Sequence, residues 1–262
     1  MRALSRMPLH ALPLLVLLCA AAPVAPARAA DPASPEGAAP VDQGRYVISV
    51  GDRNIGTEDF AMRVLGDSLC LSTDARVVRG SGAGADTMKK QAFMSVDAGN
   101  YALRVYQSNL RQNGKELVRG IVIGDTLFTL YREIDGNGTG DRMVLPPGRM
   151  YVIDPMLYSL MNFMVYSLRE QSFASRPVNL LTLGARDSMV EATLEKVGTE
   201  TVAYQQRSVQ VRHWRLGQGG VVFDLYVDSR GRLLRILNQP TGLRVERQAQ
   251  KVKPRPAGQP KP

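Results

Sequence analysis

The chain has 262 residues, 44% of them hydrophobic, and a formal net charge of +9. It contains only two cysteines and two histidines, and one of each lies among the first 29 residues. If those residues are removed by processing, a disulfide within the chain, a multi-histidine metal site and a zinc-protease motif are all excluded.

Residues 1–29 have the organisation of a secretory signal peptide. Arg2 and Arg6 give a positive start, residues 11–22 form a short apolar segment, and residues 27–29 supply an Ala-Arg-Ala cleavage site. The apolar segment is shorter than the roughly 18 to 20 residues that span a bilayer. A lipidated Cys19 is the alternative, but Leu18 before it does not suit lipoprotein processing. We therefore expect a periplasmic protein, cleaved near Ala29, that does not span a membrane.

Two segments without apolar periodicity flank the expected domain. Residues 30–43 are rich in Ala, Pro and Gly and are expected to be a flexible leader, and residues 248–262 to be a disordered, basic, Pro-rich tail. Residues 44–247 are expected to form a single β-rich domain. Export argues against nucleic acid as a partner. The tail favours an anionic envelope polymer or an envelope protein, with a role in solubility as the alternative.

Alternating segments separated by short turns predict an antiparallel meander. Asn113-Gly114 is the strongest hairpin signal because both residues tolerate positive φ. The glycine-rich residues 79–86 are expected to be a mobile loop and residues 198–200 a turn, while Cys70 is interpreted as a buried strand residue. The expected strands are 46–50, 55–65, 88–96, 101–110, 116–123, 126–133, 177–183, 188–197, 201–206, 208–216, 221–227 and 232–239.

One helix is expected near residues 154–170. Asp154 is a good N-cap, Pro155 suits the first helical position, and apolar residues then recur around most of the helix circumference. Such a helix must be covered on most sides. The predicted fold class is therefore mainly β: a strongly curved antiparallel meander sheet, a half-barrel of about ten to twelve strands, wrapped around this one apolar helix.

The sequence offers little support for catalysis. After processing, His213 is the single histidine, and no Gly-x-Ser-x-Gly elbow is present, so we interpret it as a structural or surface residue. The acidic pairs Glu58 with Asp59 and Asp187 with Glu191 come without a pocket pattern and are interpreted as surface carboxylates. We expect no catalytic residue.

Residues 135–141 resemble the opening of a calcium-binding loop, because oxygen-bearing side chains stand at alternating positions. The glutamate that should close such a loop is replaced by Pro146, and no helix precedes it. A glycine-rich hairpin turn explains the same residues. We expect no metal and no cofactor, and Thr139 and Asp141 are the first positions at which calcium binding would be tested.

Methionine is abundant in and before the expected helix. Of 11 methionines, five lie between residues 143 and 164. Flexible thioethers adapt to irregular apolar partners, so the cluster suits a cavity for acyl chains of varied shape. An ordinary core explains the same residues, and the periodicity favours it.

Three segments together resemble a family of exported bacterial domains of unknown function. They are residues 50–60 (VGDRNIGTEDF), residues 153–158 (IDPMLY) at the start of the helix, and residues 228–236 (DSRGRLLRI). The fold of this family is similar to that of the lipoprotein carriers LolA and LolB, in which a curved antiparallel sheet surrounds helical plugs. The resemblance implies a periplasmic half-barrel, although less helix is expected here than in the carriers.

The expected function is therefore non-enzymatic binding of an apolar or amphipathic, lipid-like envelope molecule inside the half-barrel. The alternatives are an envelope scaffold that uses sheet edges and the basic tail, and a hydrolase that uses acidic residues. The candidate ligand-binding residues are Met156, Leu160, Met161, Phe163 and Met164 on the helix and Trp214 on the sheet.

Overall fold

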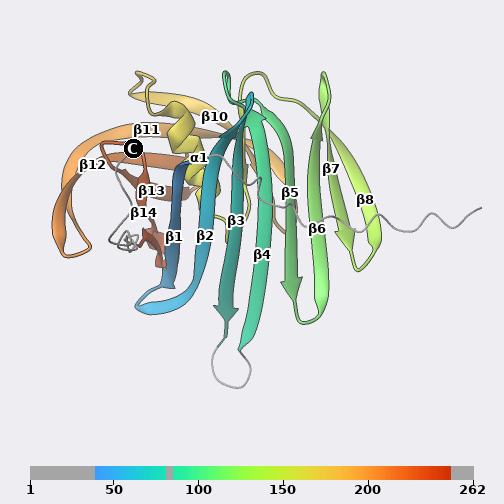
Figure 1. Ribbon diagram of the computed structural model, residues 1–262, viewed down its shortest axis with the longest axis horizontal. Helices are drawn as coiled ribbons and strands as arrows, with labels where there is room; N and C mark the ends of the chain where they lie inside the picture. Colours follow the sequence, from blue (N-terminus) through green and yellow to red (C-terminus); the bar gives the residue numbers. More distant parts are fainter. Residues whose placement is uncertain (1–38, 81–84, 249–262) are drawn as a thin grey trace, which may run out of the picture. The chain divides into compact units, whose positions relative to one another are not determined.

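A single curved sheet dominates the computed structural model, which describes residues 39–80 and 85–248 (Figure 1). All of these residues belong to one compact unit, Ser34–Pro262. The sheet has fifteen strands in the order β8-β7-β6-β5-β4-β3-β2-β1-β15-β14-β13-β12-β11-β10-β9. The predicted class, a strongly curved and mainly antiparallel sheet around one helix, is confirmed, and the number of strands is higher than expected.

The strands vary widely in length. They are β1 (Pro40–Val50), β2 (Arg53–Leu65), β3 (Ser68–Arg79), β4 (Asp86–Asp97), β5 (Leu103–Gln112), β6 (Lys115–Ile123), β7 (Leu127–Ile134), β8 (Asn137–Val144), β9 (Met150–Ile153), β10 (Ser175–Thr182), β11 (Ser188–Tyr204), β12 (Arg207–Gln218), β13 (Val221–Val227), β14 (Leu233–Asn238) and β15 (Leu243–Arg247). The single α-helix of the described residues is α1 (Ser159–Leu168), and a short 3₁₀ helix, η2 (Gln239–Thr241), precedes β15.

The sheet consists of two meanders that are joined by pairing of the first and last strands of the chain. Strands β1 to β8 pair in sequence order, and β10 to β15 pair in sequence order on the other side. Strand β15 then pairs with β1, which makes the two meanders one sheet. Within the described sheet, the only parallel pair is β9 with β10. The two edge strands, β8 and β9, are therefore neighbours in sequence but lie at opposite edges of the sheet.

Turn chemistry explains most hairpins. Asn113 and Gly114 both have positive φ, 51° and 73°, as the predicted Asn-Gly turn between β5 and β6 requires. The turn expected at residues 198–200 is wrong, because β11 runs through it with a bulge between Lys196 and Gly198. The chain turns instead at Gln205 and Gln206, which have positive φ without being glycine. The expected strands also leave out β8, β9 and β15, which are short or polar, and β3, of which the sequence analysis placed only Cys70 in a strand.

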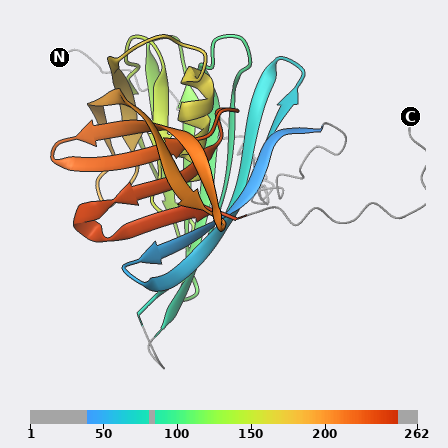
Figure 2. The same cartoon turned by 90° about the vertical axis from the view of Figure 1, so that its left-hand side faces the viewer.

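Helix α1 lies on the concave side of the sheet (Figure 2) and nine of its ten residues are buried. The expected start at Asp154 is wrong, because residues 154–157 form a turn closed by an isolated bridge between Asp154 and Leu157. Met156 in this turn has a φ of 76°. Tyr158 is the N-cap instead, and its own side chain makes no capping hydrogen bond. The Asp154 carboxylate is directed toward the sheet, as described below.

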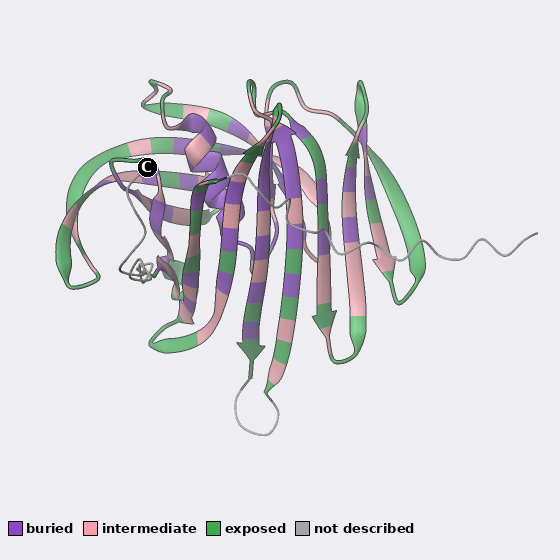
Figure 3. Ribbon diagram, viewed as in Figure 1, coloured by how far each residue is buried: buried purple, intermediate pink, exposed green. Residues whose placement is uncertain are grey.

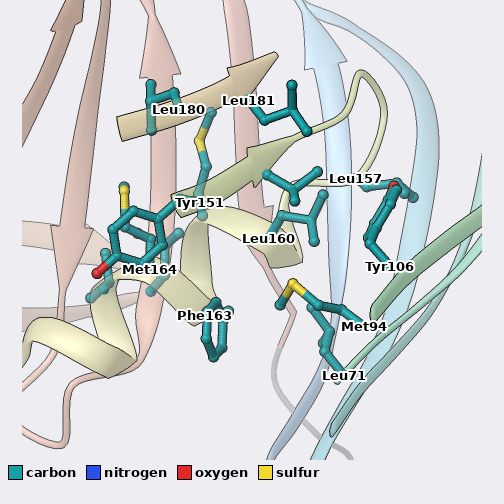
Figure 4. Close-up of a cluster of buried hydrophobic side chains, with 14 of the residues drawn as sticks. Leu71, Met94, Tyr106, Tyr151, Leu157, Leu160, Phe163, Met164, Leu180 and Leu181 are labelled. Atoms are coloured by element: carbon teal, nitrogen blue, oxygen red, sulfur yellow. The ribbon is translucent and has the colours of Figure 1, made fainter. Parts of the chain in front are cut away.

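The core fills the space between α1 and the concave face. Leu157, Leu160, Phe163 and Met164 interdigitate with side chains from β3, β4, β5, β9 and β10 (Figure 4). Buried and exposed residues alternate along the strands that cover the helix, whereas β8 is exposed along almost its whole length (Figure 3). The core is therefore one-sided within the sheet and thins toward β8.

The ends of the chain fall largely outside the described residues. The expected signal peptide (1–29) and most of the leader and tail lie there, as does the middle of the glycine-rich segment, residues 81–84. Strand β1 begins at Pro40, so residues 40–43 of the expected leader belong to the sheet. Among residues 39–80 and 85–248, no helix has the length and apolar character needed to cross a membrane.

Candidate functional site

A row of polar side chains crosses the concave face of β5 to β8. The strand registers place Ser108, Arg119, Arg132 and Thr139 opposite one another on four consecutive strands. On this face, the positions next to the polar row are mainly apolar. Ile121 and Leu130 lie on one side of the row, and Leu110, Leu117 and Ile134 lie on the other. We call the concave face of β6, β7 and β8, with its polar row and apolar flanks, the wing.

A pocket of about 450 Å³ opens in the wing. Its walls come from β7, from β8 and from the loop between β10 and β11, and its lining residues are Leu130, Arg132, Asp141, Met143, Ala185, Arg186 and Asp187. This volume lies within the range of small-molecule sites, roughly 300 to 1,000 Å³. The lining combines an apolar floor with four charged side chains, which suits a ligand that is itself amphipathic.

Ion pairs and a hydrogen bond attach the β10–β11 loop to the wing. The Arg119 guanidinium donates from Nη2 to the Gly184 carbonyl oxygen at 2.6 Å and lies 3.7 Å from the Asp187 carboxylate. Arg132 also donates to the Asp187 carboxylate, which in turn accepts from the Gly184 amide. These contacts bring a loop from the β9 side of the sheet to the concave face of β6 and β7, and they form one wall of the pocket.

Arg119 is the buried member of this group. Its side chain is 7% exposed, and its Nε has no hydrogen-bond partner. Its register partner on β7 is Arg132, so two cationic side chains stand directly opposite each other on adjacent strands. Like charges in that arrangement repel. Asp187, which lies next to both guanidinium groups, offsets this repulsion only in part because it supplies a single carboxylate.

Behind Arg119, the buried Asp154 carboxylate joins the wing to the helix. It accepts hydrogen bonds from the Lys90 ammonium, from Tyr106 at 2.5 Å and from Ser108 at 3.1 Å, and Arg119 lies 3.8 Å away. Burial lowers the pKa of Lys90, and the charge of Asp154 opposes that effect. Burial also raises the pKa of Tyr106 well above its ordinary value. Asp154 therefore holds the turn before α1 against β4 and β5.

A second buried carboxylate caps the helix. Glu58, on β2, accepts the backbone amides of Tyr158 and Ser159 and the hydroxyls of Ser159 and Thr73. Burial raises the pKa of Glu58 to about 7, and the hydrogen bonds that it accepts oppose the effect of burial. A carboxylate at a helix N-terminus also interacts favourably with the helix dipole. The capping group that the helix itself lacks is thus supplied by the sheet.

A third polar contact fixes the middle of α1. Asn162 donates to the Asp42 carboxylate at 2.9 Å and accepts from the Leu233 amide at 3.0 Å. Asp42 forms a buried ion pair with Arg247, which joins β1 to β15. The helix is therefore held by specific hydrogen bonds along its length as well as by apolar packing.

The six predicted ligand-binding residues lie in or against the core. Five of them, Leu160, Met161, Phe163, Met164 and Trp214, are at most 3% exposed, and Met156 is partly buried against the same core. The four helix residues are brought together, whereas Trp214 lies on β12 against Phe173 and Lys196. Side chains this deeply buried contact a ligand only if α1 moves, and their role in binding stays a prediction.

The other predicted candidates have structural explanations. Glu58 and Asp59 point to opposite faces of β2, and Asp59 pairs with Arg45 on the exposed face, so the two do not form a catalytic pair. The interpretation of Glu58 as a surface carboxylate is wrong, because it is fully buried. The other acidic pair also separates, since Asp187 is bound to arginines and Glu191 is exposed.

The calcium-like segment is a hairpin. Asp135 and Gly136 have positive φ and form the turn between β7 and β8, and residues 137–141 belong to β8. The Asp135 carboxylate accepts the Glu116 amide. In the part of the chain that the structure describes, no group of three or more His, Cys, Asp or Glu side chains is placed to hold a metal ion.

Two single residues behave as the sequence indicates. Cys70 is buried on β3. His213, on β12, is a structural residue, because it stacks on Tyr226 and its ring nitrogens contact the Asp224 and Glu200 carboxylates.

Sequence reasoning missed Arg119, Arg132 and Arg186. Each is one of many arginines in the chain, and no local motif distinguishes it. Only the strand register brings the first two together, and only the curvature of the sheet brings the β10–β11 loop to them. The available signal was the spacing of two residues between Arg119 and the apolar Leu117 and Ile121, which places a charge on the same, buried face of β6.

These features define a mainly β protein with one curved antiparallel sheet, an enclosed helix and a charged pocket in the wing. No family model matches the chain, and no curated protein matches it. Among solved structures, a DUF1089 family protein from Pseudomonas aeruginosa is similar at 11% identity, over 68% of this chain and 87% of that chain, with a TM-score of 0.42. A likeness at this level carries no argument about function.

Proposed function

We propose that this chain is an exported periplasmic protein that binds an amphipathic, lipid-like envelope molecule on the concave face of its half-barrel, without catalysing a reaction. The observation that carries the proposal is the pocket in the wing, where the apolar Leu130 and Met143 lie beside four charged side chains. Burial of an apolar chain contributes about 25 cal/mol of favourable free energy per Å² removed from water, before the entropy lost on binding is subtracted.

The helix restricts where such a ligand can lie. Helix α1 contacts β9 and β14, and its polar residues are bound to β1 and β2. The concave space beside those strands is therefore filled by the protein itself. In the wing, by contrast, the concave side chains Ile134, Asp141 and Thr139 are exposed. In this proposal α1 closes one end of the concave space, and the ligand occupies the wing.

The test is native mass spectrometry of protein purified from the periplasm. We expect a mature chain that begins at Ala30 and carries a bound molecule, which organic extraction removes. Met143→Lys places a charge on the pocket floor and should abolish the bound mass. Val144→Lys is the matched control, because Val144 is the next residue of the same edge strand, faces the opposite side and is 74% exposed.

Three results would contradict parts of the proposal. A wild-type protein found only at the mass of the bare chain contradicts lipid binding. A bound mass that survives equally in Met143→Lys and Val144→Lys contradicts binding in the wing. A chain that retains residues 1–29 contradicts export.

The exposed edge supports a scaffold as a second candidate function. Seven of the eight residues of β8 are exposed, and the strand has no neighbour on its outer side within the described sheet. Such an edge can accept a strand from another protein. If a scaffold role holds, deletion of residues 248–262 should release the protein from envelope fractions while its lipid content stays unchanged, and retention of the truncated chain in those fractions contradicts the predicted role of the tail.

A further inference from the structure

We propose that the pocket in the wing selects an amphiphile with an oxyanion headgroup, a carboxylate or a phosphate, through the guanidinium groups of Arg132 and Arg186 with Arg119 behind them. This inference rests on the proposed function, because it names the ligand class of the same site. The headgroup would lie against the arginines, and the apolar part would lie against Leu130 and Met143.

The arrangement of cations is the first argument. Lys90 and Asp154 neutralise each other in the buried network, and among the described residues Asp187 is the only carboxylate next to both Arg119 and Arg132. The group therefore holds one more positive charge than negative. A guanidinium whose charge is not matched inside the protein is a preferred partner for carboxylate and phosphate groups.

An unpartnered donor is the second argument. The Nε of Arg119, which lies behind the pocket lining, is one of four buried side-chain donors without an acceptor among the described residues; the others belong to Arg176, Arg212 and Trp214. A buried donor without an acceptor is costly, roughly 1 to 3 kcal/mol, and such groups are rare in folded proteins. The Arg119 and Arg132 side chains also stand opposite each other on adjacent strands. An oxyanion from a ligand would relieve their repulsion, as Asp187 does in part.

The accessible cation of the pocket is Arg186. It lies in the exposed β10–β11 loop, and its side chain has no hydrogen-bond or ion-pair partner among the described residues. Substitution of Arg186 therefore removes no contact that holds the fold. Arg132 is 30% exposed, so it can contact a ligand while still bound to Asp187.

Asp141 provides a test of the sign of the effect. It lines the same pocket from β8, is exposed, and has no partner for its carboxylate among the described residues. A negative charge at this position repels an anionic headgroup. Removal of that charge in Asp141→Asn should therefore strengthen the binding of an anion, which a variant that merely damages the pocket would not do.

The experiment compares ligands that share one chain and differ in headgroup. Delipidated mature protein is titrated in a calorimeter with dodecanoate, dodecyl phosphate and dodecanol below their aggregation concentrations, and with acetate and inorganic phosphate alone. We expect at least one of the two anionic amphiphiles to bind tenfold or more tightly than dodecanol. The stronger of the two identifies the headgroup as carboxylate or phosphate.

The variants must separate charge from folding. Arg186→Gln should lower the affinity for the anionic amphiphile about tenfold and leave that for dodecanol unchanged, and Asp141→Asn should raise the anion affinity severalfold. Arg142→Gln is the matched control, because Arg142 is an exposed arginine of β8 on the opposite face and its loss should change nothing. Thermal unfolding of each variant checks that the fold is intact.

The outcomes distinguish this inference from the proposed function. Equal affinity for dodecanol and both anions overturns the oxyanion inference and leaves lipid binding standing. Absence of binding by all three amphiphiles contradicts both. Binding of acetate or phosphate alone, without any gain from the apolar chain, supports the oxyanion site and contradicts lipid binding.

Discussion

Two regions of the concave face differ in how their polar groups are paired: the region around α1, which we call the helix end, and the wing. Around α1, the buried carboxylates of Asp42, Glu58 and Asp154 each accept two or more hydrogen bonds. In the wing and in the β10–β11 loop beside it, Asp141 and Arg186 have no side-chain partner among the described residues. The helix end is a finished core, whereas the wing holds charges and apolar surface that a ligand can complete.

The largest loss of stability is expected when the carboxylate that joins the two regions is removed. Asp154→Ala leaves the ammonium of the buried Lys90 unpaired, and breaking a buried ion pair from one side costs about 3–5 kcal/mol. Urea unfolding measures the change. Lys90→Met combined with Asp154→Leu should cost clearly less, because neither charge is then buried alone. If the double replacement lowers the free energy of unfolding as much as Asp154→Ala does, the loss is not caused by a buried charge without its partner.

Truncation of a buried side chain of α1 is expected to lower the free energy of unfolding by nearly as much. Leu168 is completely buried near the end of α1, and a Leu→Ala change at such a site costs about 2–5 kcal/mol because it removes apolar contacts and leaves a cavity. Thermal or urea unfolding of Leu168→Ala provides the measurement. A loss below about 1 kcal/mol would mean that the helix end is not the rigid core described above.

The helix cap should make stability depend on pH. Because the pKa of Glu58 is about 7 in the folded protein and 4.5 when unfolded, the folded state binds the proton more tightly between those values. The contribution of Glu58 to stability is therefore fully present at and below pH 4.5 and is lost as the pH rises from 4.5 through 7, by about 3 kcal/mol in total. Glu58→Gln should remove this slope. Unfolding free energies at pH 5, 6, 7 and 8 test it, and equal slopes in both proteins would contradict the assignment.

The smallest effect on folding is expected in the wing. Met143 is only partly buried on an edge strand, so Met143→Ala should change the free energy of unfolding by about 1 kcal/mol or less. Its effect should appear instead in ligand affinity. Urea unfolding and calorimetric titration of the same preparation compare the two. A stability loss as large as that of Leu168→Ala would remove the contrast between the two regions.

The sequence was sufficient for the architecture because the signals are local. Hairpins follow from residues such as Asn113 and Gly114, and the apolar circumference of 159–168 shows that a sheet must wrap around it. The start of the helix was misjudged for a physical reason. Asp154 has the chemistry of an N-cap, but its carboxylate is bound by Lys90 and Tyr106 from distant strands, and Glu58 caps the helix instead.

The pocket could not be predicted in the same way. Its charged residues come from β7, from β8 and from a loop more than 40 residues further along the chain. Their proximity depends on the register of three hairpins and on the curvature of the whole sheet, neither of which leaves a local pattern. The methionine-rich helix, which does leave such a pattern, belongs to the core.

The central claim is that ligand binding occurs in the wing while the helix end stays closed. Hydrogen exchange of the mature protein, measured with and without saturating dodecanoate, tests it directly. We predict added protection in β7, β8 and residues 184–187, with no change in α1 or around Trp214. Protection confined to α1 and Trp214 would contradict this account and would place the ligand among the six residues that the sequence alone indicated.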